Sequence, residues 1–313
     1  MRAKFGLVFV FTMFLPPPPA VANVLALDDA LRATYVACVG IDEELTDLKK
    51  MAGINTAITA VGTAVNVGAT VVGISKEQVD KEIDELITKL RTAEKKRYET
   101  GAPELSNEEK QKILDAMGTG VATAQDTELS QLQDKSKKLG NWRTGLLATG
   151  AATNVAGTII AAKNKVDADL DTQINSCKES IANLRTSIMQ ARINGEDVAE
   201  AQSIASACGD FELVDISKIN KRGKGAMISS GVGAAMGLAG TITSAAANSN
   251  TIRSQKTDDG LRTDKEKNLN TASNVLAGAS AAASATATVF NATQIKAIKQ
   301  VAEVASKCTG VLK

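Results

Sequence analysis

The stretch that most constrains the fold is the uncharged run at 51–75, which consists mainly of Gly, Ala, Thr, Val and Asn. Small side chains recur in it at every fourth position, and on a helix this spacing forms a nearly flat stripe that a second helix can approach closely. No strict two-residue alternation runs through the segment, so a helix is favoured over a strand. Because Gly and β-branched residues are weak helix formers, the helix needs neighbours packed against it.

Related runs occupy 139–162, 225–252 and 268–295. The tetrapeptide Ala-Gly-Thr-Ile appears at 156–159 and again at 239–242, which indicates an internal duplication. The run at 225–252 has the densest four-residue spacing of small side chains, as in a glycine zipper. The residues predicted to pack helix against helix are Gly225, Ser229, Gly233, Gly237, Ala60, Ala64 and Gly68.

Beyond its first 22 residues the chain contains one proline and few aromatic residues but much alanine, which is typical of an all-α protein. Turns are expected near Pro103, Asn194 and Asp258. Where two antiparallel helices are joined by a turn, residues equally far from the turn lie side by side, and this relation places the four runs next to one another. The predicted fold is therefore all-α, an elongated antiparallel up-down-up-down bundle or coiled coil built from Gly/Ala-rich internal repeats. A helical hairpin at 76–136 is expected to project from one end.

Several flanking helices are predicted from apolar residues in steps of three and four. One covers 27–50, another begins at a capping box formed by Ser75 and Gln78, and the clearest coiled-coil stretch covers 166–193. The inward residues of that stretch are Leu170, Ile174, Cys177, Ile181, Leu184, Ile188 and Ala191.

The first residues resemble a cleavable export signal, residues 1–22, followed by a single domain at 23–313. Arg2 and Lys4 precede an apolar run at 5–15, and Ala20-Val21-Ala22 provides small side chains for cleavage. The apolar run is too short to span a bilayer. The protein is expected to be exported, to the periplasm or the extracellular space.

The four cysteines, Cys38, Cys177, Cys208 and Cys308, all lie on apolar faces of predicted helices. In an exported chain this pattern predicts two disulfides rather than four reduced thiols. The pairing Cys177–Cys208 and Cys38–Cys308 is expected, because the first pair flanks the Asn194 turn and the second joins the terminal helices. Sequence alone leaves all three connectivities open.

The composition argues against catalysis and against ligand binding. The chain has no histidine, the usual general base and the commonest transition-metal ligand, and its cysteines lack zinc-site spacing. Asp167, Asp169 and Asp171 alternate as in a calcium loop, but the glycine and glutamate of that loop are missing. No enzyme activity, cofactor, metal or small-molecule substrate is predicted, and the balanced charge argues against nucleic acid.

The prediction for function is a structural or interaction protein of the bacterial cell envelope, stapled by disulfides. It would contact a protein partner, or a second copy of itself, through the coiled-coil hairpin. The alternative is a membrane-active or pore-forming protein, because the uncharged runs match a bilayer in length and small-xxx-small spacing is how membrane helices associate. Against insertion, Asn, Thr and Ser interrupt every run, and lysines flank both ends.

Overall fold

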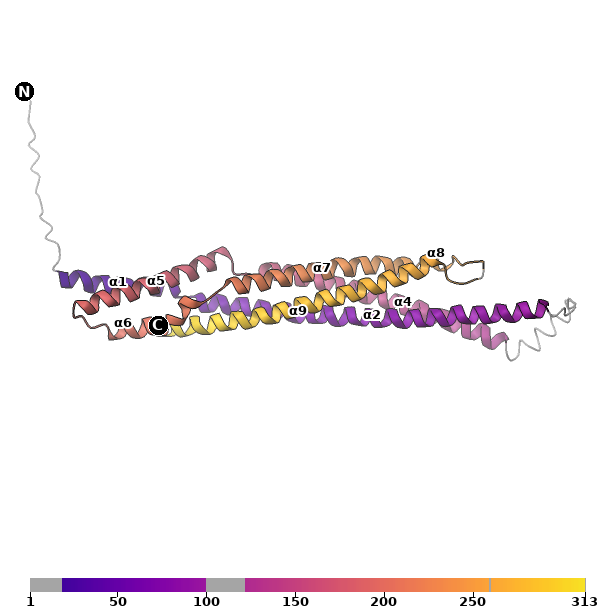
Figure 1. Cartoon of the computed structure of the whole chain (residues 1–313), viewed down its shortest axis with the longest axis horizontal. Helices are drawn as coiled ribbons and strands as arrows, with labels where there is room; N and C mark the ends of the chain where they lie inside the picture. Colours follow the sequence, from indigo (N-terminus) through magenta and orange to yellow (C-terminus); the bar gives the residue numbers. More distant parts are fainter. Residues whose placement is uncertain (1–18, 100–121, 259, 313) are drawn as a thin grey trace, which may run out of the picture. The chain divides into compact units, whose positions relative to one another are not determined.

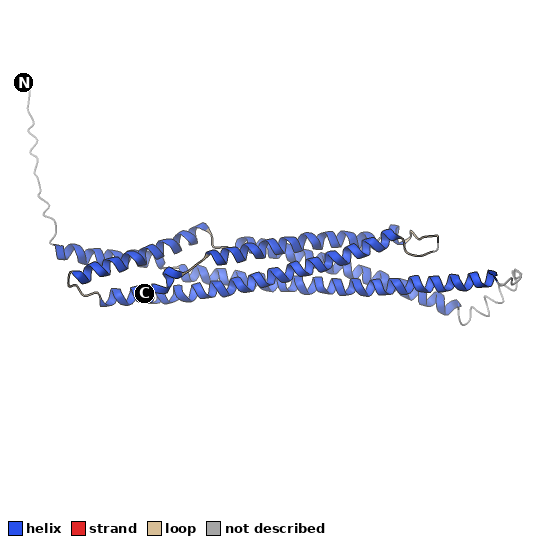
Figure 2. Cartoon of the chain, in the orientation of Figure 1, coloured by secondary structure: helices blue, strands red, loops and turns tan. Residues whose placement is uncertain are grey.

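The computed structural model describes residues 19–99, 122–258 and 260–312, which are helical along most of their length (Figure 1, Figure 2). This confirms the predicted all-α class for the described part of the chain. Most of the predicted signal (1–18) and the middle of the predicted hairpin (100–121) lie outside the described residues. In chain order the elements are α1 (Pro19–Cys38), α2 (Ile41–Glu99), α4 (Ala122–Lys163), α5 (Ala168–Ile193), α6 (Ala199–Ala207), the 3-10 helix η1 (Gly209–Leu213), α7 (Ser217–Ala247), α8 (Asn250–Arg253) and α9 (Asp264–Leu312).

The chain divides into two compact units. Unit 1 comprises Met1–Asp47, Val166–Ile216 and Ile298–Lys313, and unit 2 comprises Leu48–Lys165 and Ser217–Ala297. Two of the helices, α2 and α9, therefore contribute residues to both units.

Unit 1 has an apolar core centred on α5. All seven residues predicted to face inward from 166–193 are buried. The side chain of Asp167 caps the helix by accepting a hydrogen bond from the amide of Leu170 at 2.8 Å. After Asn194 the chain reverses at Gly195, whose φ of 80° is a conformation that glycine adopts without strain. The apolar face of α6 then packs back onto α5.

Two predicted helix boundaries are wrong. The helix expected over 27–50 is interrupted, because α1 ends at Cys38 and Gly40 turns the chain with a φ of 90° before α2 begins at Ile41. The helix start expected at Ser75 is absent, since α2 continues without a break from Ile41 to Glu99. A capping box marks a helix start only where the preceding residues leave the helix, and the small-residue run before Ser75 stays helical.

All four cysteines form disulfides in unit 1, but the predicted pairing is wrong. The bonds are Cys38–Cys177 and Cys208–Cys308, with Cα–Cα distances of 4.8 and 4.4 Å. Cys177 and Cys208 differ in distance from the Asn194 turn by three residues, or about 4.5 Å along a helix. After Cys208 the chain leaves α6 for η1, and the residue next to Cys177, Lys178, donates a hydrogen bond to the carbonyl of Val214. Helix α1 lies against α5 instead, where Thr34 donates a hydrogen bond to the carbonyl of Ser180 at 3.2 Å.

In unit 2, segments of α2, α4, α7 and α9 pack around a shared interior. Residue numbers fall on one helix as they rise on its neighbour, so these contacting helices run antiparallel. The contacts that establish this are Asn66 with Gly150 and Gly62 with Asn154 between α2 and α4; Gly157 with Ser230 and Leu147 with Gly240 between α4 and α7; and Gly225 with Phe290 and Gly237 with Ser280 between α7 and α9.

Candidate functional site

The interior of unit 2 is the most unusual region of the described chain, because it is built largely from polar side chains. Its centre is a hydrogen-bonded layer of four residues that are fully buried. Ser284 on α9 donates to the side-chain oxygen of Asn154 on α4 at 2.9 Å, and accepts from the amide of Asn66 on α2 at 3.2 Å. The amide of Asn154 also donates to Ser280, which in turn donates to the carbonyl of Gly233 on α7. The layer thus connects all four helices.

A second and a third layer repeat this arrangement towards the end of unit 2 that adjoins Leu48. Asn55 donates to Asn291 at 2.9 Å, and the amide of Asn291 donates to Thr59 at 3.4 Å. Beyond them, the amide of Gln294 donates to the main-chain carbonyl of Asn164 at 2.9 Å. The two bonds of Asn291 join α2 to α9, and the bond of Gln294 joins α9 to the residue that directly follows α4. Such pairs hold helices together where no water competes for the polar groups.

Glycines on neighbouring helices make the room that these amides occupy. A Cβ at Gly150 would collide with the side chain of Asn66, and one at Gly62 would lie 2.9 Å from the side-chain oxygen of Asn154. A Cβ at Gly233 would lie 2.9 Å from the amide nitrogen of Asn154, which is closer than side chains approach. These glycines are therefore required for a buried amide as well as for close helix approach.

The seven residues predicted to pack helices against one another all lie in unit 2 but differ in exposure. Gly233 and Gly237 are buried, and a Cβ at Gly237 would lie 3.1 Å from the Cβ of Ala151 on α4. Ala60 and Ala64 are exposed on α2, so the packing prediction does not hold for them. The remaining three, half-buried, are Gly225, Ser229 and Gly68. The stripe on α2 that does face the interior runs instead through Asn55, Thr59, Gly62 and Asn66.

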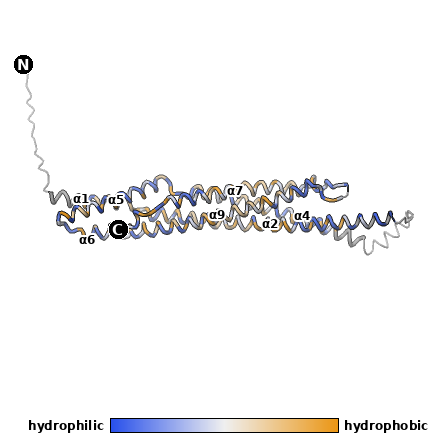
Figure 3. Tube along the Cα trace, in the orientation of Figure 1, coloured by the Kyte–Doolittle hydropathy of each residue, from blue (hydrophilic) through white to orange (hydrophobic). Residues whose placement is uncertain are grey.

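The outer surface of unit 2 is apolar where its interior is polar. Between Ile54 and Ile74 on α2, every exposed side chain is alanine, valine or isoleucine. Every exposed side chain in 225–247 on α7 is likewise alanine, valine, leucine or isoleucine, and Ile242 is 69% exposed. The middle of α7 and α9 accordingly appears white to orange in Figure 3, whereas the region around α8 is blue. Large apolar side chains exposed on unit 2 include Val61, Val67, Val71, Val155, Ile159, Ile228, Val232, Leu238, Val275 and Val289.

A buried network of charges closes the end of unit 2 near α8. At its centre is Asp80 on α2, which accepts hydrogen bonds from Lys76 and Ser136, both at 2.5 Å, and from Arg262 at 3.1 Å. Arg262 also donates to Asp84 at 3.0 Å. Lys76, Asp80 and Arg262 are each almost completely buried. The network therefore ties the turn before α9 to both α2 and α4.

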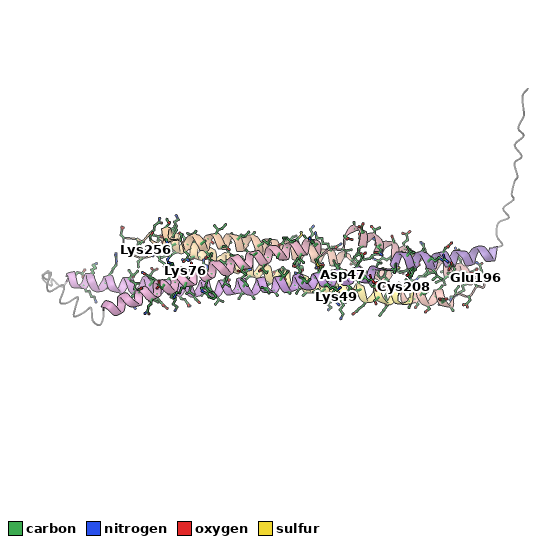
Figure 4. The ribbon with its side chains drawn as sticks, turned by 180° about the vertical axis from the view of Figure 1, so that it is seen from behind. Asp47, Lys49, Lys76, Glu196, Cys208 and Lys256 are labelled. Atoms are coloured by element: carbon green, nitrogen blue, oxygen red, sulfur yellow. A yellow bond between two sulfur atoms is a disulfide. The ribbon has the colours of Figure 1, made fainter. Side chains whose placement is uncertain are left out.

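Glu266, on the first turn of α9, is a further buried acid at this end of the unit. It is 3% exposed and lies 3.5 Å from the amine of Lys256, which appears near Lys76 in Figure 4. Burial raises the pKa of the Glu266 carboxyl above its ordinary value, while the nearby lysines oppose that change. Burial lowers the pKa of the Lys76 amine, against the attraction of Asp80. These charged groups form ion pairs and hydrogen bonds with one another, and such contacts between different helices fix the helices in register.

The polar stripe on α2 was not predicted, although its spacing is present in the sequence. Asn55, Thr59 and Asn66 follow one another in steps of four and seven, the same helical spacing that marks an apolar stripe. Ile54, Val61 and Val71 fall on the opposite face, so the face that usually forms a core is the exposed one. The network around Asp80, in contrast, brings together residues from three distant segments, and no local sequence pattern predicts it.

Four helical stretches among the described residues are long and apolar enough to cross a membrane: 26–89, 129–193, 199–247 and 264–312. In the most apolar window of each, only 28–33% of the residues are buried. Comparisons with protein-family models, with curated proteins and with solved structures found no match to this chain.

Proposed function

We propose that this is an exported, non-enzymatic structural or interaction protein of the bacterial cell envelope whose unit 2 is embedded in a lipid bilayer. The two disulfides fit an oxidising compartment outside the cytosol. The embedded part is an antiparallel bundle made from the small-residue repeats. Its spanning segments are the uncharged stretches 51–75, 144–162, 225–252 and 268–295.

The observation that carries this proposal is the reversal of polarity in unit 2. In a water-soluble bundle, the apolar stripe of each helix faces the core and the polar residues face solvent. Here Asn66, Asn154 and Ser284 are buried, while Val61, Val232 and Ile242 are exposed. A lipid environment favours that distribution, because apolar side chains contact acyl chains and polar groups such as those of Asn154 and Ser284 bond to one another inside the bundle.

The alternative, a soluble bundle, leaves a large apolar surface in water. Each valine, isoleucine or leucine that stays exposed forgoes about 1.5–3 kcal/mol of burial free energy. Single exposed apolar residues are normal in soluble proteins, but contiguous apolar faces on neighbouring helices mark contact with a membrane or a protein. The threonines on these helices also suit lipid. Thr63 and Thr70 donate to the carbonyls of Thr59 and Asn66 in their own helix, so neither hydroxyl needs water.

The dimensions of the segments also support a bilayer. At about 1.5 Å per residue, the shortest segment, 144–162, extends about 28 Å, and the hydrocarbon core of a bilayer is about 30 Å thick. Lysines such as Lys49, Lys163 and Lys296 lie just outside the segments, where long basic side chains can reach the headgroups. With four spans, chain connectivity puts every cysteine on the same side as residue 23, the expected mature N-terminus. This topology places the exported N-terminus and the oxidised cysteines in the same compartment.

The opposite side of the bilayer would carry the hairpin at 76–136, which we keep as the proposed contact surface for a protein partner or a second copy. The described part of this hairpin supports it: α2 continues through Glu99 and exposes charged side chains such as Lys81 and Glu82. These residues offer a polar surface for recognition.

The proposal is tested by extracting membranes with alkaline carbonate after export of the full chain. The wild-type protein should remain with the lipid pellet. Replacing Val232, which is 45% exposed on α7 near the middle of its segment, with lysine should release most of the protein or abolish insertion, because a charge in mid-bilayer costs about 2.5–3.5 kcal/mol.

The matched control is Leu213→Lys in unit 1. Leu213 is 85% exposed but lies outside the proposed spans, so this variant should stay with the pellet. Recovery of the wild-type protein in the soluble fraction, or equal behaviour of the two lysine variants, would contradict a bilayer-embedded unit 2.

A further inference from the structure

A surface groove of about 520 Å³ runs along α4 next to α2, where the apolar surface of unit 2 meets its charged end. Leu139 and Trp142 of α4, with Val72 of α2, form its apolar part. Its polar part contains Lys135, Lys138 and Asp134. The α4 residues recur in steps of three and four, so one face of α4 carries all of the lining except Val72.

Along the helix axis the groove changes from apolar, beside the proposed spans, to charged, farther from them. A lipid leaflet changes in the same way from its acyl chains to its headgroups. Trp142 and Val72 lie level with the outermost part of the proposed spans, whereas Lys135 is about two helical turns, or about 10 Å, farther out. Tryptophan concentrates at the membrane–water interface, because its ring is apolar and its N–H seeks a polar partner. Trp142 is 69% exposed, which leaves its ring free to contact lipid.

We propose that this groove binds one phospholipid with an anionic headgroup. The phosphate and the headgroup charge lie against the amines of Lys135 and Lys138. The upper part of one acyl chain lies against Val72, Leu139 and Trp142. This inference rests on the bilayer-embedded unit 2 proposed above and names the lipid that this part of its surface selects.

The charges of the groove set the expected selectivity. Each lysine close to an anionic surface favours the bound lipid by about fivefold. Asp134 in the same groove offsets one of the two lysines, so the net preference for an anionic over a zwitterionic headgroup should be about fivefold. A variant with asparagine in place of Asp134 should raise that preference.

Trp142 makes the test direct, because it is the only tryptophan of the chain. The full-length oxidised protein is reconstituted into phosphatidylcholine vesicles that contain a small fraction of lipid with brominated acyl chains. Bromine quenches tryptophan fluorescence only at short range. Brominated phosphatidylglycerol should quench Trp142 with an association constant about fivefold higher than that of brominated phosphatidylcholine. Soluble glycerophosphate should not relieve the quenching if a membrane lipid is the ligand.

Two charge-matched variants separate the groove from general surface attraction. Lys138→Gln should reduce the preference for phosphatidylglycerol to near one, whereas Lys137→Gln, at an exposed neighbour outside the groove, should retain most of it. Both lysines are exposed, so neither substitution removes a buried contact.

Each outcome decides a different statement. Equal quenching by the two brominated lipids in the wild-type protein, or an equal loss of preference in both lysine variants, would overturn the lipid site and leave bilayer insertion intact. Absence of quenching by either lipid would instead contradict the embedded unit 2.

Discussion

Asn154 and Asn270 are both buried in the interior of unit 2, but they differ in hydrogen bonding. Asn154 accepts from Ser284 at 2.9 Å and donates to Ser280 at 3.4 Å. Neither side-chain atom of Asn270 has a hydrogen-bond partner among the described residues, although the residue is only 2% exposed. A buried amide without partners costs about 1–3 kcal/mol, whereas a paired one contributes to stability. The same residue type should therefore have opposite effects at the two positions.

Replacement of each asparagine by leucine, which has a similar shape, tests this difference. Asn270→Leu should raise the free energy of unfolding of unit 2 by about 1 kcal/mol, and Asn154→Leu should lower it by roughly 2 kcal/mol. Chemical unfolding followed by Trp142 fluorescence measures unit 2 specifically. A destabilised Asn270→Leu variant would mean that this amide has a partner in the folded protein.

At this scale the sequence predicted which cysteines are oxidised but not how they pair. Four cysteines on apolar helix faces indicate disulfides in any arrangement, whereas the choice of partner depends on a three-residue difference in level between Cys177 and Cys208. Of the residues predicted to pack α2 against its neighbours, Ala60 and Ala64 are exposed, whereas the polar Asn55 and Asn66 are buried. The spacing of small residues identifies a stripe on a helix but not the face of the helix that is buried.

Among the elements, α2 connects several parts of the structure, and no local pattern in its sequence predicts these connections. Its residues contribute to both units, and its Asp80 and Asp84 hold the turn before α9 through Arg262. The helical character of the long runs was predictable from composition and the absence of alternation. The continuity of α2 through Ser75 was not, because a helix start and a helix interior can carry the same capping residues.

Removal of Arg262 should show how much this connection contributes. Arg262→Ala leaves Asp80 and Asp84 without their arginine, and breaking a buried ion pair in this way typically costs about 3–5 kcal/mol. The matched control is Lys95→Ala, also in unit 2, since Lys95 pairs with Glu99 at 3.7 Å but its side chain is 77% exposed. An exposed pair contributes at most about 1 kcal/mol. The midpoint of chemical unfolding, read from Trp142, should fall strongly for the first variant only. Equal midpoints would show that the charge network adds nothing to stability.

For the molecule as a whole, the two units have different means of stabilisation. Unit 1 has an apolar core and both disulfides, which close loops of 139 and 100 residues. By loop entropy alone, each bond contributes roughly 5 kcal/mol. Unit 2 has a polar interior joined by side-chain hydrogen bonds and a buried charge network. Reducing agents should therefore lower the stability of unit 1 by more than that of unit 2.

Thermal unfolding with and without dithiothreitol tests this division. Circular dichroism reports the helices of both units, and Trp142 reports unit 2 alone. Reduction should lower the melting temperature of the part of the circular dichroism transition that belongs to unit 1 by more than 10 °C. The transition reported by Trp142 in unit 2 should move by only a few degrees. If both signals shift together, the two units unfold as one cooperative body and the division does not apply to stability.

The fit of amides over glycines has a consequence for how such a chain can change over generations. Asn66 occupies the space above Gly150, and Asn154 occupies the space beside Gly62 and Gly233. Any side chain added at one of these glycines must be accompanied by a shorter residue in place of the opposing asparagine. The interior therefore evolves by paired exchange, while the exposed valines and isoleucines can replace one another singly. Covariation between distant positions, rather than conservation at each, would be the record this architecture leaves in its descendants.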